Sequence, residues 1–483
     1  MNYRMIFNLL GKVLKVEGIL LLLPTLVAVI YGETCVFALG GSAIGVFLLG
    51  LLLTSLIKPK SQLFFAKEGL ISVALSWIFV SVFGALPFVI SGEIPSFIDA
   101  LFETVSGFTT TGASIIPDVE KISKGLNFWR CFTHWIGGMG VIVFVLAFSE
   151  RAQDRSMYIL RAEMPGPIIG KLVPRARDTA VILYLIYIVM TVVLFVMLLL
   201  GGVNVYESAC HALGTAGTGG FGIKTDSCAS YSPYVQWVLG VFMLLFGVNF
   251  NLYYLILVRK FKSALKSTEL QVYLAIVLVS TGLITYNIYN LFGNLPDAVR
   301  ASFFQVSSII TTTGFSSANF DAWPNLSKGI LFILMFIGGC AGSTAGGFKV
   351  SRVVIVFKKI VNDLKTTLHP RTKTVLRFEG KRLDEQTVNS VCSYSIIYVF
   401  AFVVIFLLLC FDGNVPQSSA IESNLSAAAS CFNNIGPAFR FASMNYAGYS
   451  PFSKVVLTLA MLLGRLEIYP VLLSLNPSTW IKK

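Results

Sequence analysis

Four short polar segments interrupt an otherwise apolar chain, and each carries a glycine suited to presenting backbone carbonyl groups. They read TTTGA at 109–113, TGGFG at 218–222, TTTGF at 311–315 and NNIGP at 433–437. Glycine reaches the left-handed backbone region at little cost, which residues with a Cβ resist. Rings of carbonyl oxygens can replace the hydration shell of a monovalent cation. None of the segments contains Lys or Arg, so their charge also suits a cation.

Other chemistry has less support in the residues. The eight cysteines stand singly, and His134, His211 and His369 lie far apart, so no metal cluster or pairing of nucleophile and base is indicated. We therefore expect neither enzyme activity nor a cofactor. A single Thr-Thr-Gly triplet is also common in turns between helices, and ordinary turns in a helical bundle remain the alternative. Four copies in the same context favour a pore.

The elements that must position these segments repeat as well. Each segment follows an amphipathic stretch too short to cross a bilayer, which takes about 20 helical residues. These stretches are Ser96–Phe108, Val205–Gly217, Ala298–Ile310 and Ser418–Phe432. An apolar span precedes each stretch and a second one follows each segment. In the second spans, glycines recur at 137, 247, 338 and 464, at a similar distance after the segment glycine.

The repeated unit predicts an all-α integral membrane protein. Non-helical backbone at membrane depth is tolerated only inside protein or against a water-filled cavity, so the four segments must meet around one pore in a pseudo-fourfold arrangement. Four units and two N-terminal transmembrane helices make about ten crossings. The predicted boundaries are 1–62 for the N-terminal pair and 63–150, 175–262, 267–360 and 388–483 for the four repeats.

Composition agrees with a lipid environment. The 483 residues are 55% hydrophobic and 13% charged, with a mean hydropathy of +0.77, beyond what soluble proteins of this length show. Apolar runs, several of them long enough to span, are Gly18–Tyr31, Phe37–Ile57, Thr179–Leu200, Val235–Val258, Val272–Leu291, Ile330–Ile337 and Ser393–Phe411. Ile19–Ile30 is interpreted as a retained helix and not a cleaved signal, because another hydrophobic span follows it.

The net charge of +13 invites a nucleic-acid interpretation, but most of the basic residues lie at the same ends of the predicted membrane spans. Of 37 Lys and Arg, 28 lie near the termini or in 58–67, 151–177, 259–266 and 349–382. Under the positive-inside rule this places both termini and these loops in the cytoplasm, and no nucleic-acid partner is expected. Eight cations fall on the opposite side: Lys121, Lys124, Arg130, Lys224, Arg300, Lys328, Arg440 and Lys454.

Helix dipoles and acidic residues also suit a cation pore. Each half-length helix would aim its negative C-terminal end at the pore axis. Acidic residues predicted outside could concentrate cations at the mouth, although a solvated rim without special role explains any single one equally well. They are Glu93, Asp118, Glu120, Asp226, Asp321 and Asp412.

These features together resemble the Trk/Ktr/HKT superfamily of potassium transporters, and within it the TrkH branch, over nearly the whole chain. The resemblance implies a selectivity filter for potassium with no cofactor. The implied filter residues are Thr110, Thr111, Gly112, Thr218, Gly219, Gly220, Thr312, Thr313, Gly314, Asn434, Ile435 and Gly436. In this family a serine in place of the first filter glycine goes with sodium permeability, so Gly112 favours potassium. Ala438 departs from the usual glycine and puts only the turn after the fourth segment in doubt.

The second span of the third repeat contains GGCAGSTAGG at 338–347, which resembles the family's intramembrane gating loop. Each interior glycine costs a helix about 1 kcal/mol relative to alanine, so a break is expected from the residues alone. The alternative is a small-residue face for close helix packing. The candidate gate residues in this stretch are Gly338, Gly339, Gly342, Ser343, Thr344, Gly346 and Gly347.

Arg465 completes the candidate gate. An arginine within a span costs at least about 2.5 kcal/mol on insertion scales, so it should face a cavity or a partner. It resembles the family's pore-lining arginine, which could raise the barrier to cations or hold the loop through hydrogen bonds to carbonyls. A structural pair with Glu467 or with neighbouring backbone is the alternative.

The resemblance further implies a multi-pass protein of a prokaryotic cytoplasmic (inner) membrane. It implies a homodimer that binds a cytosolic, nucleotide-binding regulatory subunit of the TrkA type. The basic stretches 151–177 and 349–390 are candidate surfaces for that subunit, and anionic membrane lipid is the other candidate partner. Potassium uptake, either passive or as a sodium or proton symporter, is the predicted function. An alternating-access secondary transporter is the alternative, but it predicts two inverted repeats.

Overall fold

The computed structural model describes residues 2–58, 66–140, 176–371 and 375–480. It is mostly helical, with one short hairpin as the strand structure of this part of the chain. The predicted loop 151–177 lies almost entirely outside the described residues. An N-terminal pair is present, formed by α1 (Tyr3–Leu20) with α2 (Leu22–Tyr31), and by α3 (Val36–Leu56). A Cβ added at Gly18 of α1 would lie 2.8 Å from the Ala43 carbonyl of α3, so glycine permits this close packing.

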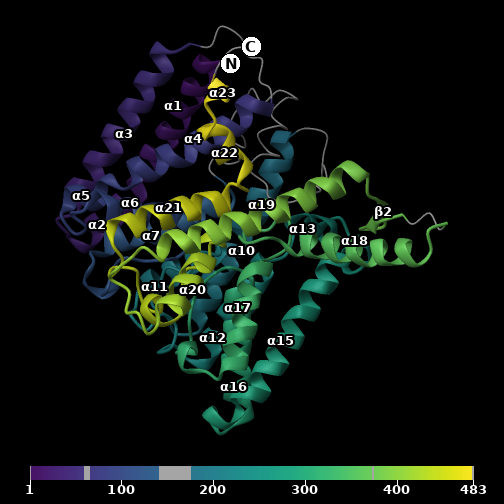
Figure 1. Ribbon diagram of the computed structural model, residues 1–483. Coiled ribbons are helices and arrows are strands. Elements are labelled where there is room, and N and C mark those ends of the chain that lie inside the picture. Colours follow the sequence, from purple (N-terminus) through teal and green to yellow (C-terminus); the bar gives the residue numbers. More distant parts are fainter. Residues whose placement is uncertain (1, 59–65, 141–175, 372–374, 481–483) are drawn as a thin grey trace.

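The rest of the described chain forms four helical groups (Figure 1). Group 1 holds α4 (Ala66–Gly84), α5 (Leu86–Ser91), α6 (Phe97–Phe108) and α7 (Lys124–Gly138). Group 2 holds α10 (Ala176–Leu200), α11 (Val205–Ala216), α12 (Pro233–Phe246), α13 (Phe250–Leu257) and α14 (Phe261–Leu265). Group 3 holds α15 (Thr268–Phe292), α16 (Leu295–Ile310), α17 (Asn325–Ile337) and α18 (Val350–Leu368). Group 4 holds α19 (Glu385–Leu409), α20 (Ala420–Phe432), α21 (Pro451–Arg465), α22 (Tyr469–Leu475) and α23 (Pro477–Trp480).

The half-length helices α6, α11, α16 and α20 end within one residue of the predicted positions. Three of them start with the same cap, in which a Ser or Asn side chain accepts the N–H of an acidic residue three positions later. The caps are Ser96, Asn204 and Asn294, bonded to the N–H of Asp99, Glu207 and Asp297. Such caps satisfy a free N–H, and the acidic residue suits the positive end of the helix. The fourth helix, α20, begins after Ser419 without a side-chain cap bond.

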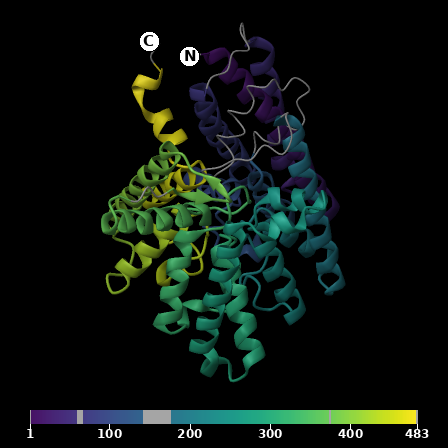
Figure 2. The same ribbon diagram turned by 90° about the vertical axis from the view of Figure 1, so that its right-hand side faces the viewer.

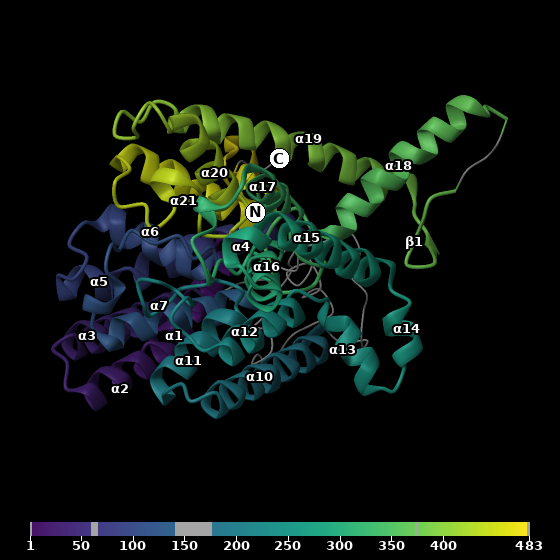
Figure 3. The same cartoon turned by 90° about the horizontal axis from the view of Figure 1, so that it is seen from below.

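The four groups pack in a closed cycle. The helix that follows each glycine segment contacts the half-length helix of the next group, so α7 contacts α11, α12 contacts α16, α17 contacts α20 and α21 contacts α6. Figure 3 shows the groups in different sectors, with α6 and α7 to the left, α11 and α12 below, and α20 and α21 above. This arrangement confirms the predicted fold class of four repeats with an N-terminal helix pair.

The second helices differ from the prediction. Six described helices are long and apolar enough to cross a membrane, and α12 with α13 would make a seventh, but this pair is bent by 91°. The run Val235–Val258, taken from the sequence as one span, is therefore two helices that meet at residues 247–249. The other second helices, α7, α17 and α21, have only 13 to 15 residues in the described chain. The number of ten crossings stays a prediction.

The described part of the basic stretch 349–390 contains a helix, α18 of the third group, and a hairpin. Helix α18 extends beyond the rest of the molecule and leads to the hairpin β1 (Arg377–Phe378) and β2 (Lys381–Arg382) (Figures 1 and 3). Helices α1 and α23 lie toward the same side of the molecule in two perpendicular views (Figures 1 and 2).

Candidate functional site

The four half-length helices end in the same backbone motif. In each, the N–H of the residue before the segment glycine bonds the carbonyl five positions back, at 2.8 to 2.9 Å; the pairs are Thr111–Ser106, Gly219–Gly214, Thr313–Ser308 and Ile435–Ser430. The preceding residue has positive φ and bonds the carbonyl three positions back. This is the Schellman pattern, which normally uses glycine at its left-handed position. Here that position holds Thr110, Thr218, Thr312 and Asn434, with φ of 54 to 58°.

The segment glycines continue this pattern. Gly112, Gly220, Gly314 and Gly436 all have positive φ, between 73 and 102°, whereas the residue before each does not. Residues of alternating handedness turn successive backbone groups toward one side of the chain. A β-branched threonine with positive φ is a backbone outlier, and such strain occurs mainly at functional sites. The four segments thus share a costly conformation that serves to direct backbone groups.

Contacts at the four glycines close a ring. A Cβ added at Gly112 would lie 1.9 Å from the carbonyl oxygen of Gly219 in the second segment. At Gly220 it would lie 1.9 Å from the oxygen of Thr313, at Gly314 2.0 Å from that of Ile435, and at Gly436 2.6 Å from that of Thr111. The carbonyl always belongs to the residue before the neighbour's glycine. The segments therefore meet in cyclic order, and each glycine leaves room for the next segment's carbonyl.

His134 of α7 supports the second segment from behind. Its Nδ1 lies 2.8 Å from the Gly107 carbonyl and its Nε2 lies 3.2 Å from the backbone N of Phe221. This network assigns Nδ1 as the donor and Nε2 as the acceptor. A Cβ at Gly219 would lie 2.1 Å from the imidazole ring, which explains why this segment has glycine at 219 as well as at 220. The sequence indicated only that His134 belongs to no metal or catalytic cluster, and it did not predict this supporting role.

Behind the first segment lies a buried ion pair that the sequence did not reveal. Nε of Arg130 lies 2.7 Å from Oε1 of Glu103, and both side chains are at most 1% exposed. Glu103 also accepts the hydroxyl of Ser114 and the N–H of Ile115, just after the glycine. A buried pair of this kind is held by such additional hydrogen bonds. The pair fixes the chain where it leaves the first segment.

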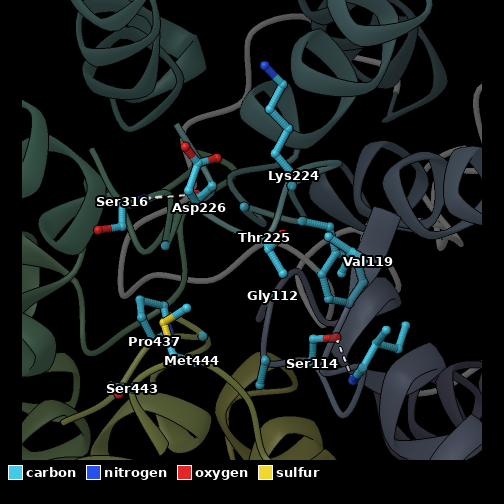
Figure 4. A pocket seen from close by; sticks show the side chains of 18 of the residues that line it. Gly112, Ser114, Val119, Lys224, Thr225, Asp226, Ser316, Pro437, Ser443 and Met444 are labelled. Carbon is cyan, nitrogen blue, oxygen red and sulfur yellow. Dashed lines mark hydrogen bonds between the residues drawn. The ribbon is translucent and has the colours of Figure 1, made fainter. Parts of the chain in front are cut away.

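The four glycines line one cavity of about 370 Å3, together with residues from the loops after each segment. Figure 4 shows Gly112, Thr225, Ser316 and Pro437 around this cavity. Near its rim, the hydrogen bond from Lys121 holds the pKa of Asp118 below its ordinary value, and hydrogen bonds from Thr225 lower the pKa of Glu120. Both carboxylates therefore stay negative at neutral pH.

The eight cations predicted for this side all have partners. Six form ion pairs and two lie over tyrosine rings; the first are Lys121, Arg130, Arg300, Lys328, Arg440 and Lys454, and the second are Lys124 and Lys224. Lys328 pairs with Glu422 and Lys454 with Asp99, at 2.5 and 2.7 Å, and these pairs join groups 3 and 4 and groups 4 and 1. Each of these eight cations thus lies beside a carboxylate or a tyrosine ring, and two of them, Arg130 and Lys224, line the cavity.

The recurrent glycines of the second helices lie against the ends of the half-length helices. A Cβ at Gly137 would lie 1.8 Å from the Phe108 carbonyl, and one at Gly464 2.0 Å from the Phe432 carbonyl. At Gly247 it would lie 2.8 Å from Thr311 of the next group. Gly338 instead follows the last residue of α17. The spacing seen in the sequence reflects close packing beside the segments.

Helix α17 ends at Ile337 and α18 begins at Val350, so residues 338–349 are not helical. We call them the 338–349 loop. The loop doubles back, because a Cβ at Gly347 would lie 2.8 Å from Cα of Gly338. This excludes the continuous packing face considered as an alternative. Gly342 and Ser343 lie at its turn, where the Gly342 carbonyl accepts the N–H of Phe250 and the Ser343 hydroxyl donates to Cys340.

The loop lies between the bend of α12–α13 and the glycine segments. The N–H of Cys340 bonds the Gly247 carbonyl at 2.9 Å, and the Thr344 hydroxyl donates to the Phe246 carbonyl at 3.2 Å. On the other side, the Gly346 N–H donates to Oγ1 of Thr312 at 2.6 Å. A Cβ at Gly339 would approach the Gly247 carbonyl to 3.1 Å. The loop is therefore in direct contact with the third segment.

Arg465, the last residue of α21, links the loop to group 1. One guanidinium nitrogen donates to the Thr344 carbonyl at 2.8 Å, and the other to the carbonyls of Gly137 and Gly138 at 2.7 and 2.9 Å. Glu467, proposed from the sequence as a possible partner, forms its ion pair with Arg352 at 2.5 Å. The hydrogen bonds to carbonyls that were one predicted option are present, and the effect of the Arg465 charge on cations stays a prediction.

The predicted site residues thus form two connected sets, the four segments and the 338–349 loop with Arg465. In the part of the chain that the structure describes, no group of three His, Cys, Asp or Glu side chains could hold a metal ion. The groups that the segments offer to a cation are backbone carbonyls.

Comparison with known proteins identifies the family to which this chain belongs. A family model described as "TrkH: Cation transport protein" matches residues 41–481. The Trk system potassium uptake protein TrkH of Salmonella typhimurium is 31% identical over 492 residues, covering 99% of this chain and 100% of that protein. TrkG of Escherichia coli, another Trk system potassium uptake protein, is 31% identical and covers 99% of both chains. The crystal structure of the potassium transporter TrkH from Vibrio parahaemolyticus matches with a TM-score of 0.88, at 29% identity over 100% of both chains. The chain belongs to the TrkH family of cation transport proteins.

Proposed function

We propose that this protein takes up potassium across the bacterial cytoplasmic membrane through a pore on the axis of its four glycine segments. The cyclic contact of each segment glycine with the neighbouring carbonyl carries the proposal. Full-length similarity to proteins named for potassium uptake supports the choice of ion. A closed cycle of four like units favours a pore over an alternating-access transporter built from two inverted repeats.

The four segments serve as the selectivity filter in this proposal. The carbonyls of Thr111, Gly219, Thr313 and Ile435 form one ring, and those of the neighbouring positions extend it along the axis. Carbonyl dipoles substitute for the hydration water of the ion. The half-length helices add the negative ends of their dipoles, which favour a cation. All four segments keep glycine, which supports potassium over sodium as the preferred ion.

The 338–349 loop serves as the gate. It fills the space beside the third segment and is held by Arg465, whose positive charge also raises the barrier to a cation. Hydrogen bonds to Thr312, Phe246 and Arg465 fix its closed position. Opening requires the loop to leave these partners, and its glycines allow the backbone to do so.

The predicted organisation extends this proposal. Both termini lie in the cytoplasm, the repeat boundaries are 63–150, 175–262, 267–360 and 388–483, and the protein acts as a homodimer with a TrkA-type regulatory subunit. The relatives are named as proteins of a Trk system, and this supports a regulatory partner. A more specific form of the proposal is that potassium uptake is coupled to sodium or protons. It predicts that rubidium uptake into proteoliposomes depends on the gradient of the coupling ion.

Potassium-limited growth and rubidium uptake in cells lacking their own uptake systems test the filter. We expect Gly112→Ser and Gly314→Ser to lower uptake and to weaken the preference for potassium over sodium. Gly282→Ser is the matched control, because Gly282 lies on α15 with no atom within 4 Å of an added Cβ. Unchanged uptake and ion preference in both filter variants would overturn the assignment.

A further inference from the structure

Glu269, the second residue of α15, holds both sides of the 338–349 loop. Its side chain is buried, and one carboxylate oxygen, Oε1, accepts two backbone N–H groups. One is that of Ala341 inside the loop, at 2.7 Å, and the other is that of Ser351 at the start of α18, at 3.1 Å. Removing this acceptor would leave both buried N–H groups without their partner, which is costly. The carboxylate thus ties the inside of the loop to the start of α18.

The hairpin that follows α18 has an unusual turn. Glu379 and Gly380 join the two strands, and both have positive φ, 49 and 72°. This is the pattern of a type I′ turn, for which Asn, Asp or Gly is normally used at the first position. A glutamate held in this strained conformation suggests that its side chain has a role of its own.

The Glu379 side chain reaches the first turn of α15. Its Oε1 accepts the hydroxyl of Ser267 and the backbone N–H of Glu269, both at 3.0 Å. Ser267 is the N-cap of α15, and its hydroxyl oxygen also accepts the N–H of Leu270. Phe378, next to Glu379, is 4% exposed and belongs to the apolar cluster that contains Cys340 of the loop. The hairpin is therefore fixed to the helix end that presents Glu269.

We propose that Glu379 and Glu269 are positioning residues that link the cytoplasmic hairpin to the gate. The link passes from the turn of the hairpin to the backbone of Glu269, and from the Glu269 carboxylate to Ala341 and Ser351. A displacement of the hairpin is thereby transmitted to the loop beside the third segment. The proposal rests on the proposed function in that the 338–349 loop is the gate; the link itself does not depend on transport.

The native Cys340 allows a test of the link that is independent of flux. Cys340 lies in the loop and is fully buried, as are Cys131 and Cys431 in the first and fourth groups. The full-length protein is reconstituted in vesicles, and maleimide labelling of each cysteine is followed by mass spectrometry. Losing two buried hydrogen bonds should raise labelling of Cys340 in Glu269→Ala about tenfold, with Cys131 and Cys431 unchanged. Glu269→Gln keeps an acceptor oxygen and should stay within about twofold of the wild type.

Variants of Glu379 test the other end of the link. Glu379→Ala should expose Cys340 in the same direction but less, and the double variant should match Glu269→Ala alone, because both residues act in one chain of contacts. The Glu379 side chain is exposed, so this variant tests the link even where Glu269→Ala exposes all three cysteines by unfolding. Cys340 unchanged in Glu379→Ala, or effects of the two variants that multiply, would overturn the proposal.

Rubidium flux separates the two claims. Increased labelling of Cys340 together with increased flux supports both the link and the gate. Increased labelling with unchanged flux supports the link and contradicts the assignment of the loop as the gate.

Discussion

The glycine segments and the breaks of the second helices lie close together, but the four segments have the same structure whereas the breaks differ between the groups. The segments follow one plan four times, with the same Schellman ending, the same signs of φ and the same contact to the next carbonyl. The breaks differ between groups: α12 and α13 meet at a 91° bend, α17 leads into a 12-residue loop (338–349), and α21 ends at Arg465. Selecting an ion requires equivalent ligands around an axis, whereas closing a pore requires only one obstruction. In the proposed function, the fourfold equivalence therefore belongs to ion binding and the differences between the breaks belong to the gate.

The largest effect is expected from replacing each segment glycine by alanine, which tests the equivalence of the four glycine segments. At Gly220 the added Cβ would lie 1.9 Å from the Thr313 carbonyl, and φ would remain positive. We expect each of the four variants to lower rubidium uptake about 100-fold or more, because the carbonyl ring cannot keep its geometry. Gly45→Ala on α3, where nothing lies within 4 Å, is the control and should retain wild-type uptake. Normal uptake in any one of the four would break the equivalence of the segments.

The buried ion pair behind the first segment should contribute strongly to stability. Arg130→Ala leaves Glu103 buried without its charged partner, and we expect the free energy of unfolding in detergent to fall by about 3 to 5 kcal/mol. The exposed pair Lys121–Asp118 provides the comparison, and Lys121→Ala should lower the free energy of unfolding far less than Arg130→Ala, because water already solvates both charges. Equal losses in the two variants would show that the pair does not support the segment.

Variants of Arg465 test the role of the 338–349 loop, which occurs in the third group. Arg465→Ala removes three hydrogen bonds to carbonyls and one positive charge beside the loop, so we expect rubidium uptake to rise about five- to tenfold. Arg465→Lys keeps the charge but not the fork of donors and should fall between the two. Uptake at or below the wild-type level in a folded Arg465→Ala protein would argue that the arginine only supports structure.

The smallest effect is expected at the bend of α12–α13. Asn249 is the N-cap of α13, where its side chain accepts the N–H of Asn251 at 2.9 Å. Asn249→Ala should lower the free energy of unfolding by about 1 kcal/mol, and Asn249→Ser should restore most of it. Denaturant titration in detergent measures both; no loss in the alanine variant would mean that the bend does not depend on this cap.

The same division explains what the sequence could predict. The half-length helices and segment glycines could be predicted because their signals are local: a short amphipathic stretch followed by a polar segment with a glycine, repeated four times. The bend at Gly247 was missed because Gly247 and Asn249, which mark it, lie inside the apolar run Val235–Val258, and this run is long enough to be interpreted as one span. The roles of His134, Glu103 and Glu269 were missed because their partners lie 11 to 87 residues away in sequence, and only folding brings them together.

The central claim, that four glycine segments form one potassium-binding ring, is tested most directly by anomalous diffraction from crystals grown in rubidium. The account predicts rubidium density on the axis between the segments, within coordination distance of the carbonyl oxygens of Thr111, Gly219, Thr313 and Ile435. Rubidium bound elsewhere in the protein, with none between the segments, would contradict it.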